Sequence, residues 1–174
     1  RLKYRYKIKL NRRNILKKTQ GKYNYAFIYN AIMNELLLND HEKYIWGEKT
    51  NLAWREIPNF FKMFPNGTVI HLIRDPRAVL ASWKNFTNSY GNDYLDTVLN
   101  CKDSMSYAKK FQSKYKNKKY IVLRYEDLVL DPKKTISKIC KIIGIHFDLE
   151  MINLANFKDK FGNKWKSNSI HKDK

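Results

Sequence analysis

The sequence predicts an α/β domain built on a parallel sheet. Two apolar runs, TVIHLI at residues 68–73 and KYIVLRY at residues 119–125, show little alternation between apolar and polar positions. That pattern is typical of strands buried on both faces of a parallel sheet. Helical patterns separate and follow these runs, and strands that alternate with helices indicate a parallel arrangement.

Length and composition allow one such domain. The chain has 174 residues, of which 43% are hydrophobic and 14% aromatic, enough for one compact domain with a single core. No internal repeat or low-complexity linker divides it. We therefore interpret residues 1–174 as a single domain.

The first third of the chain contains two predicted helices. Apolar residues recur at helical spacing over residues 23–38, and a second helix is predicted over residues 53–64, where the turn residues PNG follow. Between them, KYIWGEKTN at residues 43–51 indicates a short strand with a turn at Gly47. Residues 1–10 alternate basic and apolar side chains, which fits an edge strand or a loose basic arm.

In the rest of the chain each apolar run leads toward a helix. The predicted segments are a helix over residues 76–90, a long polar helix over 93–115, a turn over 126–132, a helix over 132–143 closed by Gly144, and a short helix over 147–157. The tail from Lys158 onward is polar and basic, and a loop is predicted there.

The charge balance is strongly basic. Lysine and arginine number 35 against 16 acidic residues, for a net charge of +19, and residues 1–22 hold ten basic residues and no acidic one. One explanation is compositional, because Lys, Asn, Ile and Tyr are all abundant, as in an AT-biased coding sequence. The other is attraction of polyanions or of small phosphorylated and sulfated ligands.

The spacing of the cysteines predicts no metal-binding site, and the hydropathy of the chain predicts no membrane-spanning segment. Cys101 and Cys140 form no CxxC pair, and neither has a histidine at metal-ligand spacing, so no metal site is expected. Cys140 shares a helical stripe with isoleucines and is expected to pack in the core. The chain contains no apolar run of membrane-spanning length and opens with no signal segment. This favours a cytoplasmic protein, with a Golgi-lumen or membrane-anchored parent left open.

The junction at Arg74 is the strongest local pointer to function. Asp75 is a good N-cap and Pro76 a favoured first helical residue, so the strand ends at Arg74 and a helix starts at once. Ligands of parallel α/β sheets bind at the carboxyl ends of strands. The planar donors of Arg74 suit a phosphate there, although the side chain could instead pair with a carboxylate.

Ser82 lies about two helical turns beyond that junction. It shares a helix face with Ala78, and the small side chains of Ala78 and Ala81 would let a ligand group approach its hydroxyl. Arg74 and Ser82 could thus converge on one phosphate. Alternatively, the Ser82 hydroxyl bonds its own backbone one turn back.

Three segments, in order, carry a family resemblance. IHLIRDPRAVLASW at residues 70–83 resembles the 3′-phosphate-binding segment of the sulfotransferases that use 3′-phosphoadenosine-5′-phosphosulfate (PAPS). WGEKTN at residues 46–51 resembles their lysine-bearing strand end, close to the form in carbohydrate and bacterial members. Residues 121–145 resemble the later strand and helix, with Tyr-Glu-Asp after an apolar strand. The resemblance covers about residues 44–145.

The resemblance implies a fold and roles for four residues. The fold is a parallel sheet flanked by helices, like that of P-loop NTPases, here incomplete at the N-terminus and at the C-terminus. Arg74 and Ser82 would bind the 3′-phosphate of the nucleotide, and Tyr125 would lie near it or else cap the sheet edge. Lys49 would act on the transferring sulfo group and its bridging oxygen, with a surface lysine as the alternative.

The chain also departs from the family pattern. Asn51 stands where cytosolic members carry a histidine base, and Asn cannot take a proton, which leaves Glu48 and His41 as nearby candidates. No Gly-rich 5′-phosphosulfate loop is found, and FGNKWKSNS at residues 161–169 matches the C-terminal phosphate loop poorly. We therefore expect this segment alone to bind nucleotide weakly and to be inactive.

These observations favour a sulfotransferase domain. It would transfer a sulfo group from PAPS, without a metal, to a hydroxyl or amine of a carbohydrate or small-molecule acceptor, leaving PAP as product. The alternative is a basic module that binds nucleic acid or another polyanion without catalysis. No nucleic-acid motif is present, so no specific nucleic-acid partner is expected.

Overall fold

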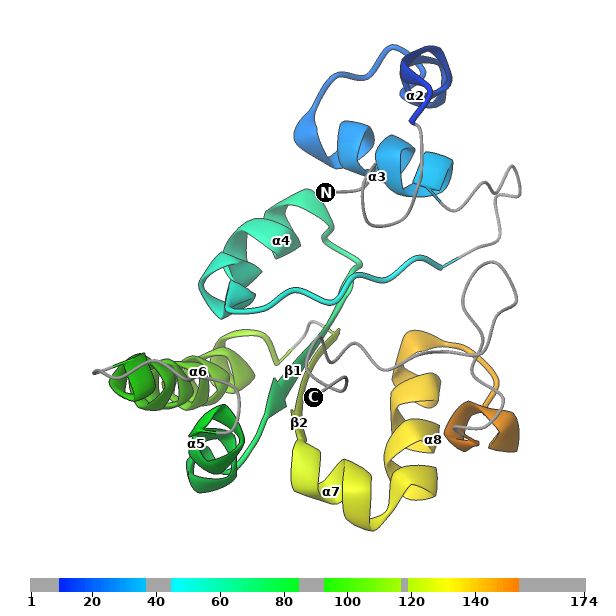
Figure 1. Cartoon of the computed structure of the whole chain (residues 1–174). Helices are drawn as coiled ribbons and strands as arrows, with labels where there is room; N and C mark the ends of the chain where they lie inside the picture. Colours follow the sequence, from blue (N-terminus) through cyan, green and yellow to red (C-terminus); the bar gives the residue numbers. More distant parts are fainter. Residues whose placement is uncertain (1–9, 37–44, 85–92, 117–118, 154–174) are drawn as a thin grey trace, which may run out of the picture. The chain divides into compact units, whose positions relative to one another are not determined.

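The computed structural model of the chain describes residues 10–36, 45–84, 93–116 and 119–153 (Figure 1). These residues belong to two compact units, Arg1–Pro65 and Asn66–Lys174, and each unit is described by itself. The interpretation of the chain as one domain stays a prediction. The expected strand or arm at residues 1–10 falls almost wholly outside the described residues, as do residues 85–90 and the tail from Lys158.

The first unit is helical in its described part. It contains α2 (Arg12–Lys18), α3 (Tyr25–Leu36), the 3-10 helix η1 (Ala53–Glu56) and α4 (Ile57–Met63). The helix predicted over residues 23–38 is therefore confirmed as α3, and that over 53–64 as η1 followed by α4. Helix α2 was not predicted, and its local cause is Asn11, whose side chain accepts hydrogen bonds from the Arg13 and Asn14 N–H groups.

A buried carboxylate joins α2 to α3. Glu35 on α3 is only 7% exposed. Its Oε2 lies 3.3 Å from Lys18 Nζ, and its Oε1 accepts a 3.4 Å hydrogen bond from Asn14 Nδ2. Because a buried charge is stable only when it is paired, these contacts fix how the two helices pack.

The short strand predicted around Gly47 is wrong for the described residues 45–50, which have no regular structure. Trp46 is held by side chains instead of by a strand ladder. Its ring centroid lies 5.5 Å from that of Phe64 and 5.5 Å from that of Tyr29, and its Nε1–H donates a 2.7 Å hydrogen bond to Asn30 Oδ1. A strand needs a neighbour for its backbone groups, and the described ladder joins β1 only to β2.

The second unit contains the sheet. β1 (Thr68–Ile73) and β2 (Lys119–Arg124) pair in parallel, from Thr68 opposite Lys119 to Ile73 opposite Arg124. The helices are α5 (Pro76–Lys84), α6 (Asp93–Lys114), α7 (Tyr125–Leu130) and α8 (Pro132–Ile143), followed by the 3-10 helix η2 (Leu149–Ile152). Helices α5 and α6 lie on one side of the strands, and α7 and α8 on the other (Figure 1). The predicted α/β alternation and parallel pairing are thus observed, on a small sheet.

One face of the sheet is covered by α6. His71 on β1 is 7% exposed, and its ring nitrogens make hydrogen bonds of 2.7 Å to the Tyr120 hydroxyl and 2.8 Å to the Ser104 hydroxyl of α6. Phe111 of α6 is 2% exposed and meets the Tyr120 ring edge-on at 6.1 Å. His71 is therefore a buried histidine whose two ring nitrogens are both held by hydroxyl groups.

The other face of β1 departs from the prediction. Ile70 is 40% exposed and Leu72 is 50% exposed, so this strand is not buried on both faces in the described part of the chain. Side chains alternate between the two faces of a strand, and the face that carries Ile70 and Leu72 is the less covered one.

The C-terminal helices match the prediction only in part. The turn predicted over residues 126–132 is wrong for most of its length, because Tyr125–Leu130 forms the helix α7 directly after β2. Helix α8 is confirmed over residues 132–143, and Gly144 ends it in the left-handed conformation at φ 86°. Cys140 is 3% exposed, as expected for a core residue.

Candidate functional site

The carboxyl ends of β1 and β2 bring Arg74 and Tyr125 together. Ile73 and Arg124 are the last paired residues of the ladder, and Arg74 and Tyr125 follow them directly. The guanidinium carbon of Arg74 lies 4.5 Å from the centroid of the Tyr125 ring, a cation–π contact. Arg74, predicted to bind the 3′-phosphate, and Tyr125, predicted to lie near the phosphate of the nucleotide or to cap the sheet edge, are therefore neighbours in the structure, although 51 positions separate them in the chain.

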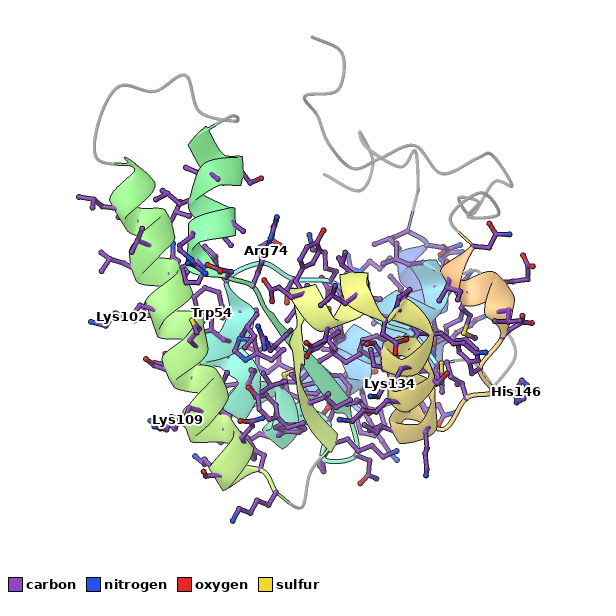
Figure 2. All side chains as sticks on the ribbon, turned by 90° about the horizontal axis from the view of Figure 1, so that it is seen from below. Trp54, Arg74, Lys102, Lys109, Lys134 and His146 are labelled. Atoms are coloured by element: carbon purple, nitrogen blue, oxygen red, sulfur yellow. The ribbon has the colours of Figure 1, made fainter. Side chains whose placement is uncertain are left out.

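Arg74 is half-buried, and its Nε atom is fully enclosed. Among the described residues no hydrogen-bond acceptor meets this Nε, and no carboxylate forms an ion pair with Arg74. Figure 2 shows Arg74 at the strand ends from which α5 and α7 begin, whereas Lys102 and Lys109 point away from α6 into solvent. The charge of Arg74 is thus available to an anionic ligand in a way that a neutralised arginine is not.

The side chain of Asp75, the residue after Arg74, caps the start of α5. Its Oδ1 accepts a 2.8 Å hydrogen bond from the Arg77 N–H, and its Oδ2 lies 2.6 Å from Arg77 Nη2. The hydrogen bond from the Arg77 side chain is the main cause that lowers the pKa of Asp75 to about 2. Asp75 is therefore ionised and paired with Arg77. It caps the helix, as expected, and forms no ion pair with Arg74.

The side chain of Glu126 links the ends of the two strands, because it contacts the backbone after β1 and the last residue of β2. Its Oε1 accepts a 2.8 Å hydrogen bond from the Asp75 N–H, and its Oε2 lies 3.8 Å from Arg124 Nε. The contact with the Asp75 N–H was not predicted from the sequence. The only signal for it in the sequence is the position of Glu126 just past a strand end.

Ser82 lies on α5, where the sequence placed it. Its side chain is partly exposed, and it is the seventh residue of the helix, about 9 Å along the axis from Pro76. A phosphate group that touches both Arg74 and Ser82 would have to lie along this face of α5. The convergence of the two side chains stays a prediction.

Lys49 belongs to the first unit and is exposed, as are Glu48 and Asn51. These residues lie in the irregular segment beside Trp46 rather than at the end of a strand. The role that the sequence predicts for Lys49 stays a prediction. His41 lies outside the described residues.

Neither a metal centre nor a membrane span is found in the described parts of the chain. Within residues 10–36, 45–84, 93–116 and 119–153, no cluster of three His, Cys, Asp or Glu side chains could hold a metal ion. No helix in those same ranges combines the length and the apolar character needed to cross a bilayer.

Comparison with known proteins identifies relatives. The model of the sulfotransferase family matches residues 3–149. Sulfotransferase 2A1 of Homo sapiens is 28% identical, in an alignment that covers 70% of this chain and 52% of that protein. Carbohydrate sulfotransferase 4 of Mus musculus is 30% identical over 45% of this chain and 26% of that protein. No solved structure matches the chain significantly.

The chain spans about half the length of the first of these relatives and about a quarter of the second. The family match nevertheless includes both strands, the Arg74–Tyr125 contact and Ser82. A match of this extent, over the same segments that carry the sequence motifs, shows that the chain belongs to the sulfotransferase family.

Proposed function

We propose that the chain contributes the 3′-phosphate site of an enzyme that transfers a sulfo group from PAPS to a hydroxyl or amine. The observation that carries this proposal is the Arg74 guanidinium, stacked on Tyr125 at the ends of two parallel strands and unpaired with any carboxylate among the described residues. Membership of the sulfotransferase family supports it. The P-loop-like architecture of the whole sheet is part of the same proposal.

Three residues would hold the nucleotide. Arg74 would bind the 3′-phosphate through its planar donors, and Ser82 would donate its hydroxyl from α5 to the same group. The Tyr125 ring would keep the guanidinium in place from the side opposite the phosphate. The protein's excess of positive charge would attract this anionic ligand from a distance.

PAPS would supply the sulfo group, bonded through an oxygen to its 5′-phosphate. Transfer would form a bond from the acceptor oxygen or nitrogen to sulfur and break the bond from sulfur to that bridging oxygen. Lys49 would hold positive charge at the bridging oxygen as negative charge builds up there. The acceptor proton needs a base, and Asn51 cannot supply one because its amide does not take up protons near neutral pH.

For the acceptor we propose a carbohydrate or another small hydroxyl compound. The Glu48-Lys49-Thr50 form of the lysine segment resembles carbohydrate members of the family, and one of the two relatives is named a carbohydrate sulfotransferase. The partners of the site would then be PAPS and this acceptor.

The test is a titration with 3′,5′-ADP, followed by calorimetry or by NMR, which detects weak binding as well. We expect Arg74→Ala to weaken binding by about tenfold or more, the size of a lost charge-assisted hydrogen bond, and Ser82→Ala by less. Lys109→Ala is the matched control, because it removes an exposed charge that points away from the strands (Figure 2). Binding that neither Arg74→Ala nor Ser82→Ala weakens would overturn the proposal.

A further inference from the structure

Helix α5 begins with a capping arrangement that one segment alone cannot complete. In a capping box the N-cap side chain accepts from the helix backbone, and a Glu or Gln three residues later accepts from the N-cap N–H. Asp75 performs the first half by accepting from the Arg77 N–H. The residue three positions later is Ala78, which has no acceptor on its side chain.

Glu126, on helix α7 just past the end of β2, supplies the missing half. Its Oε1 accepts the Asp75 N–H at 2.8 Å. The peptide group that carries this N–H is the one that joins Arg74 to Asp75. The hydrogen bond therefore fixes the backbone at the point where the Arg74 side chain leaves the strand.

The neighbouring residue Tyr125 holds the side chain of the same arginine. Its ring lies 4.5 Å from the Arg74 guanidinium carbon. The Tyr125–Glu126 dipeptide thus contacts Arg74 twice, once at the guanidinium and once at the following peptide group.

The carboxylate of Glu126 does this without neutralising Arg74. Its pKa is lowered, first by the hydrogen bond from the Asp75 N–H, so it is ionised at neutral pH. Its second oxygen faces Arg124 Nε at 3.8 Å. A carboxylate directly on the guanidinium would compete with a phosphate, whereas one that holds the adjacent peptide does not.

We propose that Glu126 is a positioning residue that orients Arg74 for the 3′-phosphate through the Arg74–Asp75 peptide group. This inference rests on the proposed function, in which Arg74 is the residue that binds that phosphate. Glu126 itself would touch no ligand.

The first test needs no nucleotide and reads the order of the Arg74 side chain. Because Arg74 Nε is enclosed, its N–H is expected to exchange slowly with solvent in an NMR measurement. Glu126→Ala should speed this exchange by about tenfold, the effect of one lost hydrogen bond, whereas Glu126→Gln should retain most of the protection because its amide oxygen still accepts. Asp127→Ala is the matched control, since it removes the exposed carboxylate next along α7. Unchanged exchange in Glu126→Ala would overturn the inference.

A second measurement covers the case in which Glu126→Ala does not fold. The amide resonance of Asp75 should shift with the titration of Glu126 in the wild-type chain, at a pH below the ordinary range of Glu. In Glu126→Gln the step due to Glu126 should vanish, and only the shift caused by the Asp75 carboxyl group itself, whose pKa is about 2, should remain. An Asp75 amide that titrates identically in both proteins would show that Glu126 does not hold this peptide.

The nucleotide test separates this inference from the proposed function. We expect the preference for 3′,5′-ADP over 5′-AMP, which lacks the 3′-phosphate, to fall in Arg74→Ala and, by a smaller factor, in Glu126→Ala. The double variant should be no worse than Arg74→Ala alone, because both changes act on one interaction. Equal binding of both nucleotides by the wild type would contradict the proposed function. The exchange rate of the Arg74 Nε–H would then test, by itself, whether Glu126 orders the Arg74 side chain. Additive losses in the double variant would contradict the positioning role.

Discussion

His71 shows at the residue scale how burial sets a protonation state. Its two ring nitrogens face the Tyr120 and Ser104 hydroxyls, and burial lowers its pKa below the ordinary value. Burial also raises the pKa of Tyr120 to about 12, so both partners stay neutral at physiological pH. A neutral imidazole offers one donor and one acceptor, and a hydroxyl can complement either.

This arrangement predicts acid sensitivity. In the unfolded chain His71 takes up its proton near its ordinary pKa, whereas the folded protein resists protonation until the pH is lower. Stability should therefore be constant above that ordinary value and fall as the pH drops below it. Urea unfolding at about pH 7.5 and about pH 5.5 measures the difference.

The control is another histidine. His71→Phe should remove most of the loss of stability between the two pH values, whereas His146→Asn, at an exposed position after α8, should keep it. An equal loss in the wild type and in His71→Phe would show that other groups cause the acid sensitivity.

Helix α8 shows at the element scale how local signals fix boundaries. Asp131 caps its start by accepting from the Lys134 N–H at 3.0 Å, Pro132 takes the first helical position, and Gly144 ends it at φ 86°. Nothing lies within 4 Å of a Cβ built on Gly144, so the requirement for glycine is conformational and not steric.

Gly144→Ala should accordingly destabilise the protein by about 1 kcal/mol, and Gly144→Asn by less, since Asn tolerates the left-handed conformation better. Gly47→Ala is the matched control, because Gly47 also has open space around its Cα but no positive φ. Thermal or urea unfolding of the three variants tests this. A loss for Gly47→Ala as large as that for Gly144→Ala would refute the conformational explanation.

The same contrast explains what could be predicted from the sequence. Helix α8 was predicted because its cap, its proline and its glycine are all local. The sequence instead predicts a turn over residues 126–132, because the N-cap of α7, Arg124, makes no side-chain capping bond that would mark a helix start. The strand around Gly47 was wrong because a strand depends on a partner elsewhere in the chain, which no local pattern reports.

Some features of the candidate site could likewise be predicted from the sequence, and others could not. Arg74 and Tyr125 could be placed at strand ends, and two parallel strands bring such ends together. The bond from the Asp75 N–H to Glu126 could not be predicted, because it spans 51 residues and follows no periodicity. The roles of Lys49 and Ser82 stay predictions that rest on the family resemblance.

At the scale of the whole molecule, the net charge of +19 attracts anions whether or not they bind at the Arg74 site. Attraction to a polyanion such as heparin should be general and should weaken steeply with salt. Removing the Arg74 charge changes this total only slightly. We therefore expect heparin binding by wild type and Arg74→Ala to fall off at the same salt concentration, while their affinities for 3′,5′-ADP differ by about tenfold. A large loss of heparin binding in Arg74→Ala would instead favour a polyanion-binding module centred on this residue.

The parallel pairing of β1 with β2 also has a consequence for folding kinetics. Thr68 pairs with Lys119, so the ladder closes only after the intervening chain, with α5 and α6, has been brought into place. Helices form from local contacts within about a microsecond, whereas pairing of distant strands must first overcome the entropy of loop closure. Arg74, Tyr125 and Glu126 meet only across the ends of this ladder, so we expect the phosphate site to be among the last parts of the second unit to form.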